Sequence, residues 1–160
     1  MARIGVTGHM NLTPPTVPLV REAIRKALAP YVPEGLTGVS CIAVGADSIF
    51  AEVVLDLGGA LEVILPAADY RDRKVKPEHA DRFDNLIRRA AGVRVMPYEV
   101  SNRDAYEAAN EALVGSSDRL VAVWDGRAPA DKGGTAAVVQ YAESMGLPVE
   151  IIWPEGAERS

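Results

Sequence analysis

The sequence is poor in the features that mark several common classes of protein. It has a single cysteine, Cys41, which excludes an internal disulfide and a metal cluster built from several thiols. Only 6% of its residues are aromatic, and no apolar run approaches the roughly 20 residues that span a bilayer. Basic residues are outnumbered, 17 against 22 acidic residues, which gives a formal net charge of −5. This charge argues against nucleic acid as a partner, because surfaces that bind nucleic acid are usually basic.

These shortages favour a cytoplasmic protein that makes no contact with a membrane. The first residues lead directly into an apolar strand, so we expect no secretory signal. His9 and His79 lie far apart in the sequence, and we therefore expect no transition-metal site. A length of 160 residues suits one domain. No linker or internal repeat divides the chain, so we expect a single domain over residues 1–160.

Short apolar runs alternate with helical patterns from one end of the chain to the other. This alternation predicts an α/β fold: a single Rossmann-like domain of three α/β/α layers with a mainly parallel sheet covered on both faces. The more charged segment Ala67–Lys76 reads as a solvated loop or as a lid. The predicted strands are Arg3–Thr7, Gly38–Val44, Leu61–Leu65, Val93–Pro97, Leu120–Trp124 and Val149–Trp153. The predicted helices are Val17–Pro30, Ser48–Leu57, Pro77–Ala91, Arg103–Val114 and Thr135–Met145.

Glycines gather where these strands are expected to end, which is where open parallel sheets bind ligands. The last of them, in Gly133-Gly134-Thr135, precedes an apolar helix. Free N–H groups and the positive end of the helix dipole make such a helix start an anion site, unless the glycines serve only a permissive turn. The ligand-binding candidates are Gly8, His9, Met10, Gly45, Ala46, Asp47, Pro66, Trp124, Asp125, Gly126, Gly133, Gly134 and Thr135.

Several of these residues have two interpretations. Asp47 could cap a helix, or accept a ribose hydroxyl and act as a general base. His9 could donate to a phosphate and move protons, or organise its own loop. Asp125 could hold ribose hydroxyls or a Mg²⁺ ion bridging phosphates, or brace its turn. Trp124 could carry a base or pack in the core.

Three further side chains complete the predictions. Glu52 could face the ligand or simply favour the dipole of its helix. Arg103 opens a predicted helix and could reach a phosphate, although an exposed position is the simpler interpretation. His79 begins a charged helix and is expected to be solvated.

Taken together, Gly5-Val-Thr-Gly-His9, Gly45-Ala-Asp47, and the block Asp118–Gly126 followed by Gly133-Gly-Thr135 resemble the SLOG superfamily. These Rossmann-like domains are related to the DNA-processing protein DprA and to the LONELY GUY phosphoribohydrolases. The same block is similar to that of the nucleoside 2-deoxyribosyltransferases. The resemblance implies a nucleotide or nucleotide-derived small molecule as ligand, and a homo-oligomer.

Two positions depart from the enzymes of this group. The residue three places after the Gly-Thr pair is a catalytic glutamate in both enzyme families, and here it is Val138. The arginine that LONELY GUY enzymes use corresponds to Ala109. The sequence therefore predicts binding or sensing of a phosphate-bearing ligand, with no cofactor required, although a Mg²⁺ ion could accompany the phosphate. The alternative is a nucleotide N-glycosidase of the phosphoribohydrolase type, using Asp47, Glu52 or Asp125 in place of the missing acid.

Overall fold

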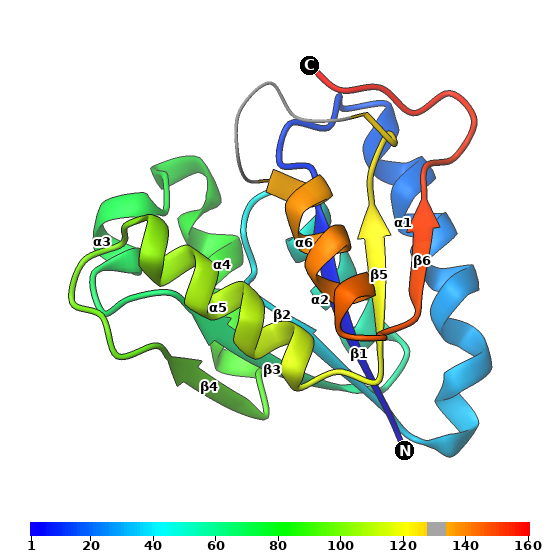
Figure 1. Ribbon diagram of the computed structural model, residues 1–160. Helices are drawn as coiled ribbons and strands as arrows, with labels where there is room; N and C mark the ends of the chain where they lie inside the picture. Colours follow the sequence, from blue (N-terminus) through cyan, green and yellow to red (C-terminus); the bar gives the residue numbers. More distant parts are fainter. Residues whose placement is uncertain (128–133) are drawn as a thin grey trace.

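Six parallel strands form the centre of the structure, a computed structural model that describes residues 1–127 and 134–160 (Figure 1). The strands lie in the order β4-β3-β2-β1-β5-β6, and every neighbouring pair is parallel. Their bounds are β1 Ala2–Gly8, β2 Leu36–Ser40, β3 Ala60–Leu65, β4 Gly92–Val95, β5 Arg119–Val123 and β6 Val149–Ile152.

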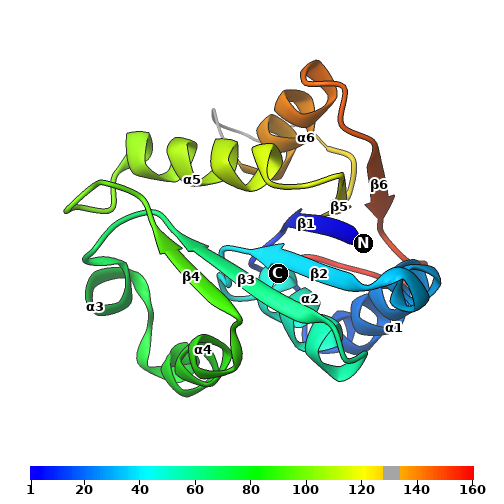
Figure 2. The same ribbon diagram turned by 90° about the horizontal axis from the view of Figure 1, so that it is seen from below.

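Helices cover both faces of this sheet. Figure 2 shows α5 and α6 above the strands and α1, α2, α3 and α4 below them, which confirms the predicted three-layer α/β/α fold. Among the described helices, none has the length and apolar character needed to cross a bilayer. The helices are α1 Thr16–Leu28, the 3₁₀ helix η1 Ala29–Glu34, α2 Ala46–Asp56, α3 Tyr70–Lys74, α4 Pro77–Arg89, α5 Arg103–Gly115 and α6 Gly134–Ser144.

The central strands are apolar because they bury side chains on both faces, as β5 illustrates. Val121 and Val123 pack into the core cluster beneath α1 and α2. Leu120 points the other way and packs with residues of α5 and α6. The edge strand β4 is different, because Val93 and Val95 are 45% and 46% exposed. The expectation that the sheet is covered on both faces therefore fails at this edge.

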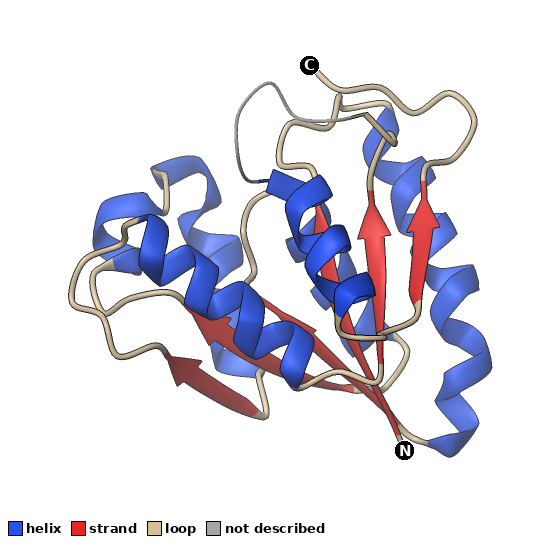
Figure 3. Ribbon diagram, in the orientation of Figure 1, coloured by secondary structure: helices blue, strands red, loops and turns tan. Residues whose placement is uncertain are grey.

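The order in which the strands are added reverses at β1, and this reversal determines where a sheet of this kind can bind a ligand. The chain moves outward from β1 through β2 and β3 to β4, and then returns through α5 to β5 on the other side of β1. The loops that follow β1 and β5 consequently leave in opposite directions, which opens a crevice at the carboxyl ends of these strands. The strand arrowheads in Figure 3 mark this end of the sheet.

Strand β2 ends at Ser40, four residues before the predicted end at Val44. The chain turns at Ile42, which has a φ of 47° in the left-handed region that β-branched residues rarely adopt. Side-chain hydrogen bonds hold this turn: the Ser40 hydroxyl accepts the Ile42 N–H at 3.0 Å, and the Ser48 hydroxyl lies 3.3 Å from the Ile42 carbonyl. The run of apolar residues that predicted the strand contains no information about such contacts, so the early end of β2 could not be predicted from it.

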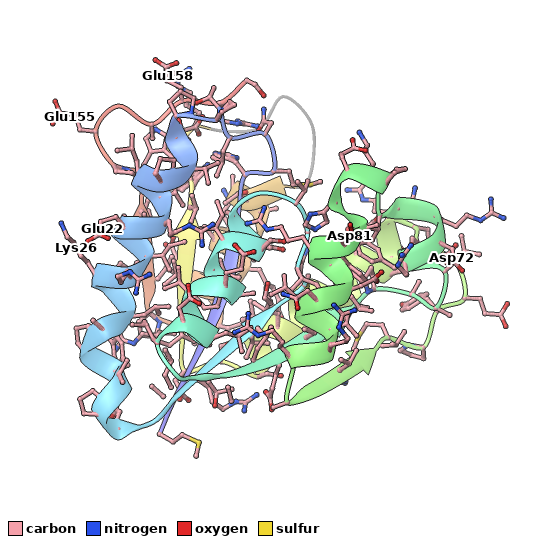
Figure 4. The ribbon with its side chains drawn as sticks, turned by 180° about the vertical axis from the view of Figure 1, so that it is seen from behind. Glu22, Lys26, Asp72, Asp81, Glu155 and Glu158 are labelled. Atoms are coloured by element: carbon pink, nitrogen blue, oxygen red, sulfur yellow. The ribbon has the colours of Figure 1, made fainter. Side chains whose placement is uncertain are left out.

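Two predictions for the neighbouring helices were wrong. His79 is only 7% exposed, and its Nε2 lies 3.3 Å from the Ile42 carbonyl, so it supports the turn instead of facing solvent. Segment Ala67–Lys76 contains the short helix α3, and Tyr70 packs there against Phe83 in the core. This segment is therefore not a plain solvated loop. Figure 4 shows charged side chains such as Glu22 and Lys26 of α1 pointing away from the molecule.

The end of β1 packs so closely against its neighbours that it has no room for a side chain. A Cβ at Gly8 would lie 2.5 Å from the Cβ of Ala46 and 2.8 Å from that of Val123. Glycine at this position therefore lets the start of α2 and the end of β5 meet over β1.

We expect Gly8→Ala to destabilise the fold by about 1–3 kcal/mol, because both neighbours belong to packed elements that cannot easily move. Gly92→Ala is the matched control, since a Cβ there meets nothing within 4 Å. Urea unfolding should give a lower midpoint for the first variant and almost no change for the second. Equal midpoints for Gly8→Ala and the wild type would show that the junction at β1 is not tightly packed.

Candidate functional site

A cleft of about 780 Å³ opens at the carboxyl ends of β1, β2, β3 and β5, between α3, α5 and the start of α6. Of the predicted ligand-binding residues, those that line it are Gly8, His9, Met10, Asp47, Pro66, Trp124, Gly134 and Thr135. Gly45, Ala46, Asp125 and Gly126 are not part of its lining, and Gly133 lies outside the described residues. The structure therefore brings the ends of four separate strands to one cavity.

Gly45 and Ala46 serve the packing of two loops. A Cβ at Gly45 would lie 2.6 Å from the carbonyl oxygen of His9, and the Ala46 N–H donates to that same carbonyl at 3.1 Å. Gly45 also has a φ of 88°, which glycine adopts without strain. The glycine at this strand end thus lets protein backbone, and not a ligand, approach closely.

His9 ties the end of β1 to the end of β5. Its Nε2 accepts the backbone N–H of Asp125 at 3.1 Å, and its ring meets Trp153 edge-on at 5.5 Å between centroids. Burial, followed by the nearby charge of Arg159, lowers the pKa of His9 below its ordinary value of 6.5. A neutral ring whose Nε2 already accepts a hydrogen bond organises the loop and does not donate from that atom to a phosphate.

Asp125 and Trp124 brace the turn that follows β5. The Asp125 carboxylate accepts the Arg127 N–H at 3.0 Å, and one of its oxygens lies 3.5 Å from the Arg159 guanidinium. The Trp124 Nε1–H donates to the Arg127 carbonyl at 3.0 Å. Trp124 nevertheless lines the cleft.

Asp47 is the acidic side chain that lines the cleft within the described residues. It does not cap α2, as the sequence suggested, because the N-cap is Gly45 and makes no side-chain hydrogen bond. Its Oδ2 instead lies 3.4 Å from the Ala43 N–H. Protein surrounds most of the carboxyl group, and this burial raises its pKa to about 7, against the lowering effect of the Ala43 N–H.

Glu52 lies outside the cleft lining. Its carboxylate forms ion pairs with Arg21 of α1 at 3.0 Å and with Arg82 of α4 at 2.6 Å. It therefore joins α1, α2 and α4, on the face of the sheet away from α5 and α6. Arg103 also lies outside the cleft, exposed on α5 and paired with Glu107 at 3.3 Å.

Sequence reasoning missed several side chains of the cleft. Tyr70 and Lys74 come from α3, while Tyr106 and Asn110 lie one turn apart on α5. The spacing of four could have marked the α5 pair, because residues four apart share a helix face. Arg159 follows β6, and no motif in the sequence marked it as part of the site. The fold brings it back to the end of β1, where its Nε donates to Asn11 at 3.0 Å.

Basic groups line the cleft although the chain is acidic overall. Lys74, Arg127 and Arg159, which we call the cleft cations, all contribute to its lining. Across residues 1–127 and 134–160, no group of three or more His, Cys, Asp or Glu side chains is placed to hold a metal ion. Val138 and Ala109 line the same cavity. They occupy the positions at which the enzymes that the sequence resembles have a catalytic glutamate and an arginine.

No protein-family model matches this sequence, and no curated protein matches it. Solved structures match its fold. DNA processing protein A (DprA) from Streptococcus pneumoniae superposes with a TM-score of 0.70 at 17% identity, over 98% of this chain and 52% of that one. This chain has the fold of DprA. It spans about half the length of the Streptococcus protein, so the match concerns one part of that molecule.

Two further structures share the DprA fold. DprA from Helicobacter pylori, described for its binding of single-stranded DNA, has a TM-score of 0.71 at 16% identity over 99% of this chain and 68% of that one. The Moco carrier protein of Chlamydomonas reinhardtii has a TM-score of 0.56 at 20% identity over 96% and 78%. The fold expected from the SLOG resemblance is confirmed, and proteins that share it bind ligands.

The Helicobacter match corrects the argument from net charge. A DNA-binding protein has the DprA fold, so nucleic acid cannot be set aside as a ligand class on the ground that this chain carries −5. The physical reason is that a ligand responds to the local field, and the cleft cations line a site whose charge differs from that of the whole chain.

We expect His9 to be neutral near pH 7 with its proton on Nδ1, because Nε2 accepts a backbone N–H. Histidine ¹⁵N spectra should show this tautomer and a midpoint below 6.5. Since the folded state binds this proton less readily than the unfolded chain, the free energy of unfolding should fall as the pH drops below about 6.5. A proton on Nε2, or a midpoint above that of a free histidine, would contradict this role.

Proposed function

We propose that this domain binds a nucleotide or a nucleotide-derived phosphate in the cleft. The observation that carries the proposal is the start of α6, an 11-residue helix whose first residues Gly134 and Thr135 line the cavity together with the cleft cations. A helix start and neighbouring cations both favour an anion. A cavity of about 780 Å³ has the usual size of a small-molecule site.

Glycine is required at the start of α6 for its conformation. Gly134 has a φ of 74°, and a Cβ there would meet nothing within 4 Å. Its space is therefore open where Gly8 and Gly45 are closed by protein. Gly126 is equally open but does not line the cleft, so Gly134 is the open glycine at the cavity, and this supports the helix start of α6 as the place for the phosphate.

Binding without cleavage is the favoured activity. Val138 and Ala109 have no charge with which to stabilise a ribosyl cation, and Asp47 is the one described carboxylate in the lining. A hydrolase would depend on that residue. Chromatography after incubation with AMP or CMP should therefore recover the intact nucleotide. Release of free base by the wild type, abolished in Asp47→Ala, would favour the hydrolase alternative instead.

The proposal predicts that binding depends on the phosphate. Calorimetric titration should give a Kd for AMP at least tenfold below that for adenosine, because the nucleoside lacks the anion. Arg159→Ala should weaken AMP binding by roughly 10-fold to 100-fold, the loss expected for one charge-assisted hydrogen bond. Arg103→Ala, a change to an exposed arginine outside the cleft, is the control and should bind as the wild type does.

Two results would contradict the proposal. The first is equal affinity for AMP and adenosine. The second is the absence of heat and of thermal stabilisation with any nucleoside phosphate at millimolar concentration, because a ligand of the native state must raise its apparent stability.

Single-stranded nucleic acid is the second candidate ligand, favoured by the fold shared with the Helicobacter protein. Tyr106 is 39% exposed at the cleft and offers an aromatic face for a base. Fluorescence anisotropy with an oligonucleotide of about 20 residues tests this directly, given the salt dependence of backbone binding. Tighter binding of the strand than of AMP, with loss of affinity as salt rises, would assign the cleft to nucleic acid.

A further inference from the structure

The protein holds the carboxyl group of Asp47 in place, but one of its two oxygens has no hydrogen-bond partner among the described residues. Its backbone carbonyl accepts the Ser40 hydroxyl at 3.0 Å, and its Oδ2 lies 3.4 Å from the Ala43 N–H. Its Oδ1 accepts no hydrogen bond from the described residues. Every fully buried side-chain N or O atom in those residues has a partner, so Oδ1 keeps access to solvent. Because Asp47 lines the cleft, this oxygen is available to a ligand.

The turn before Asp47 is strained, and its conformation positions the backbone N–H that contacts the Asp47 carboxyl group. Ile42 adopts a φ of 47°, which costs on the order of 1–3 kcal/mol for a residue of its type. Residues 41 and 43 on either side of it both line the cleft, and Ala43 supplies the N–H that meets Asp47. The backbone conformation thus orients a carboxyl group at the cleft wall.

The groups around Asp47 favour a protonated carboxyl. Burial, together with the Asp47 charge, raises the pKa of the Cys41 thiol and of the Tyr70 hydroxyl, so both stay neutral and neither supplies a charge that would stabilise an ionised carboxylate. Asp47 forms no ion pair with the described residues, unlike Glu52 with its two arginines. The remaining titratable groups of the cleft are His9, Tyr106 and the cleft cations.

The protonation state of a carboxyl group decides which heterocycle it can pair with. A protonated carboxyl offers one donor and one acceptor, and an ionised carboxylate offers acceptors only. Because the Ala43 N–H donates to Oδ2, the proton of the neutral group belongs on Oδ1, and this order of donor and acceptor matches a ring edge with an amino group beside a nitrogen acceptor, as in adenine and cytosine. The ionised carboxylate matches an edge with two donors, as in guanine. A ligand that displaces water from the cleft lowers the local dielectric further and favours the neutral form.

We propose that Asp47 is the base-recognition residue of the cleft and forms a two-point hydrogen bond with the amino and ring-nitrogen edge of an adenine-type or cytosine-type base. This inference rests on the proposed nucleotide function and names the base class that the site selects. The base lies at the Asp47 wall while the phosphate lies at the start of α6. Tyr106, which meets Tyr70 edge-on at 6.4 Å, gives the ring an aromatic neighbour.

The test compares AMP with IMP between pH 6 and pH 8.5 by calorimetry. The two nucleotides share the ribose and phosphate, so the ratio of their affinities removes the titration of the phosphate. IMP presents a ring N–H and a carbonyl where AMP presents an acceptor and an amino group, so its donor and acceptor stand in the reverse order and do not match a carboxyl whose Oδ2 accepts the Ala43 N–H. We expect AMP to bind at least tenfold more tightly at pH 6. The preference should decline by about tenfold per pH unit above the pKa of Asp47, which is about 7.

Asp47→Asn separates recognition from a structural role. An asparagine amide keeps one donor and one acceptor at every pH. This variant should therefore retain the preference for AMP, within about threefold of the wild type at pH 6, and lose its dependence on pH. Asp47→Ala should bind AMP and IMP equally. Circular dichroism and urea unfolding check that each variant folds, and Asp47→Asn alone suffices if the alanine variant does not.

The outcomes distinguish this inference from the proposed function. If no nucleotide binds the wild type, both fail. If AMP and IMP bind the wild type equally, or if their ratio in the wild type is independent of pH, the cleft binds nucleotides and the role of Asp47 is wrong. A preference for GMP over AMP that grows with pH would also overturn the inference, because it would assign recognition to the ionised carboxylate.

Discussion

The close packing at the carboxyl end of β1 determines where the other parts of the cleft lie. Gly8 leaves room for Ala46 of α2 on one side and Val123 of β5 on the other. The next residue, His9, joins this end of β1 to β5 through the Asp125 N–H and to the β2–α2 loop through its own carbonyl. A side chain at Gly8 would separate these elements, and the cavity between them would change shape.

The order of strands and helices was predictable because it depends on local patterns. A strand buried on both faces must be apolar, and an amphipathic helix must repeat its apolar residues near every fourth position. The switch at β1 then places the ligand end of the sheet by a general rule of topology. For these reasons Gly8, His9, Pro66 and Thr135 could be assigned to one site from the sequence.

The details that were not predictable depend on specific side-chain contacts, several of them between residues far apart in the sequence. Ile42 turns β2 early because Ser40, Ser48 and His79 surround it, and no repeat pattern records that arrangement. Glu52 lies in a helix that also carries Asp47, yet its arginine partners come from two other helices. The homo-oligomer and the cytoplasmic location stay predictions.

The charge of the cleft differs from the charge of the whole chain. The acidic composition led to the wrong conclusion that nucleic acid could be set aside, although three cations line the cleft. Asp47 shows the converse, since burial of an acidic residue away from any described ion pair raises its pKa to about 7. In both cases the immediate surroundings decide the chemistry of the site.

The position of the phosphate is the central claim, and amide NMR during a titration with AMP tests it most directly. The account predicts the largest ¹H–¹⁵N shift changes at Gly134 and Thr135, followed by Met10 at the end of β1, with little change in α1 or α4. Shift changes centred on another face of the sheet, with Gly134 and Thr135 unaffected, would contradict it.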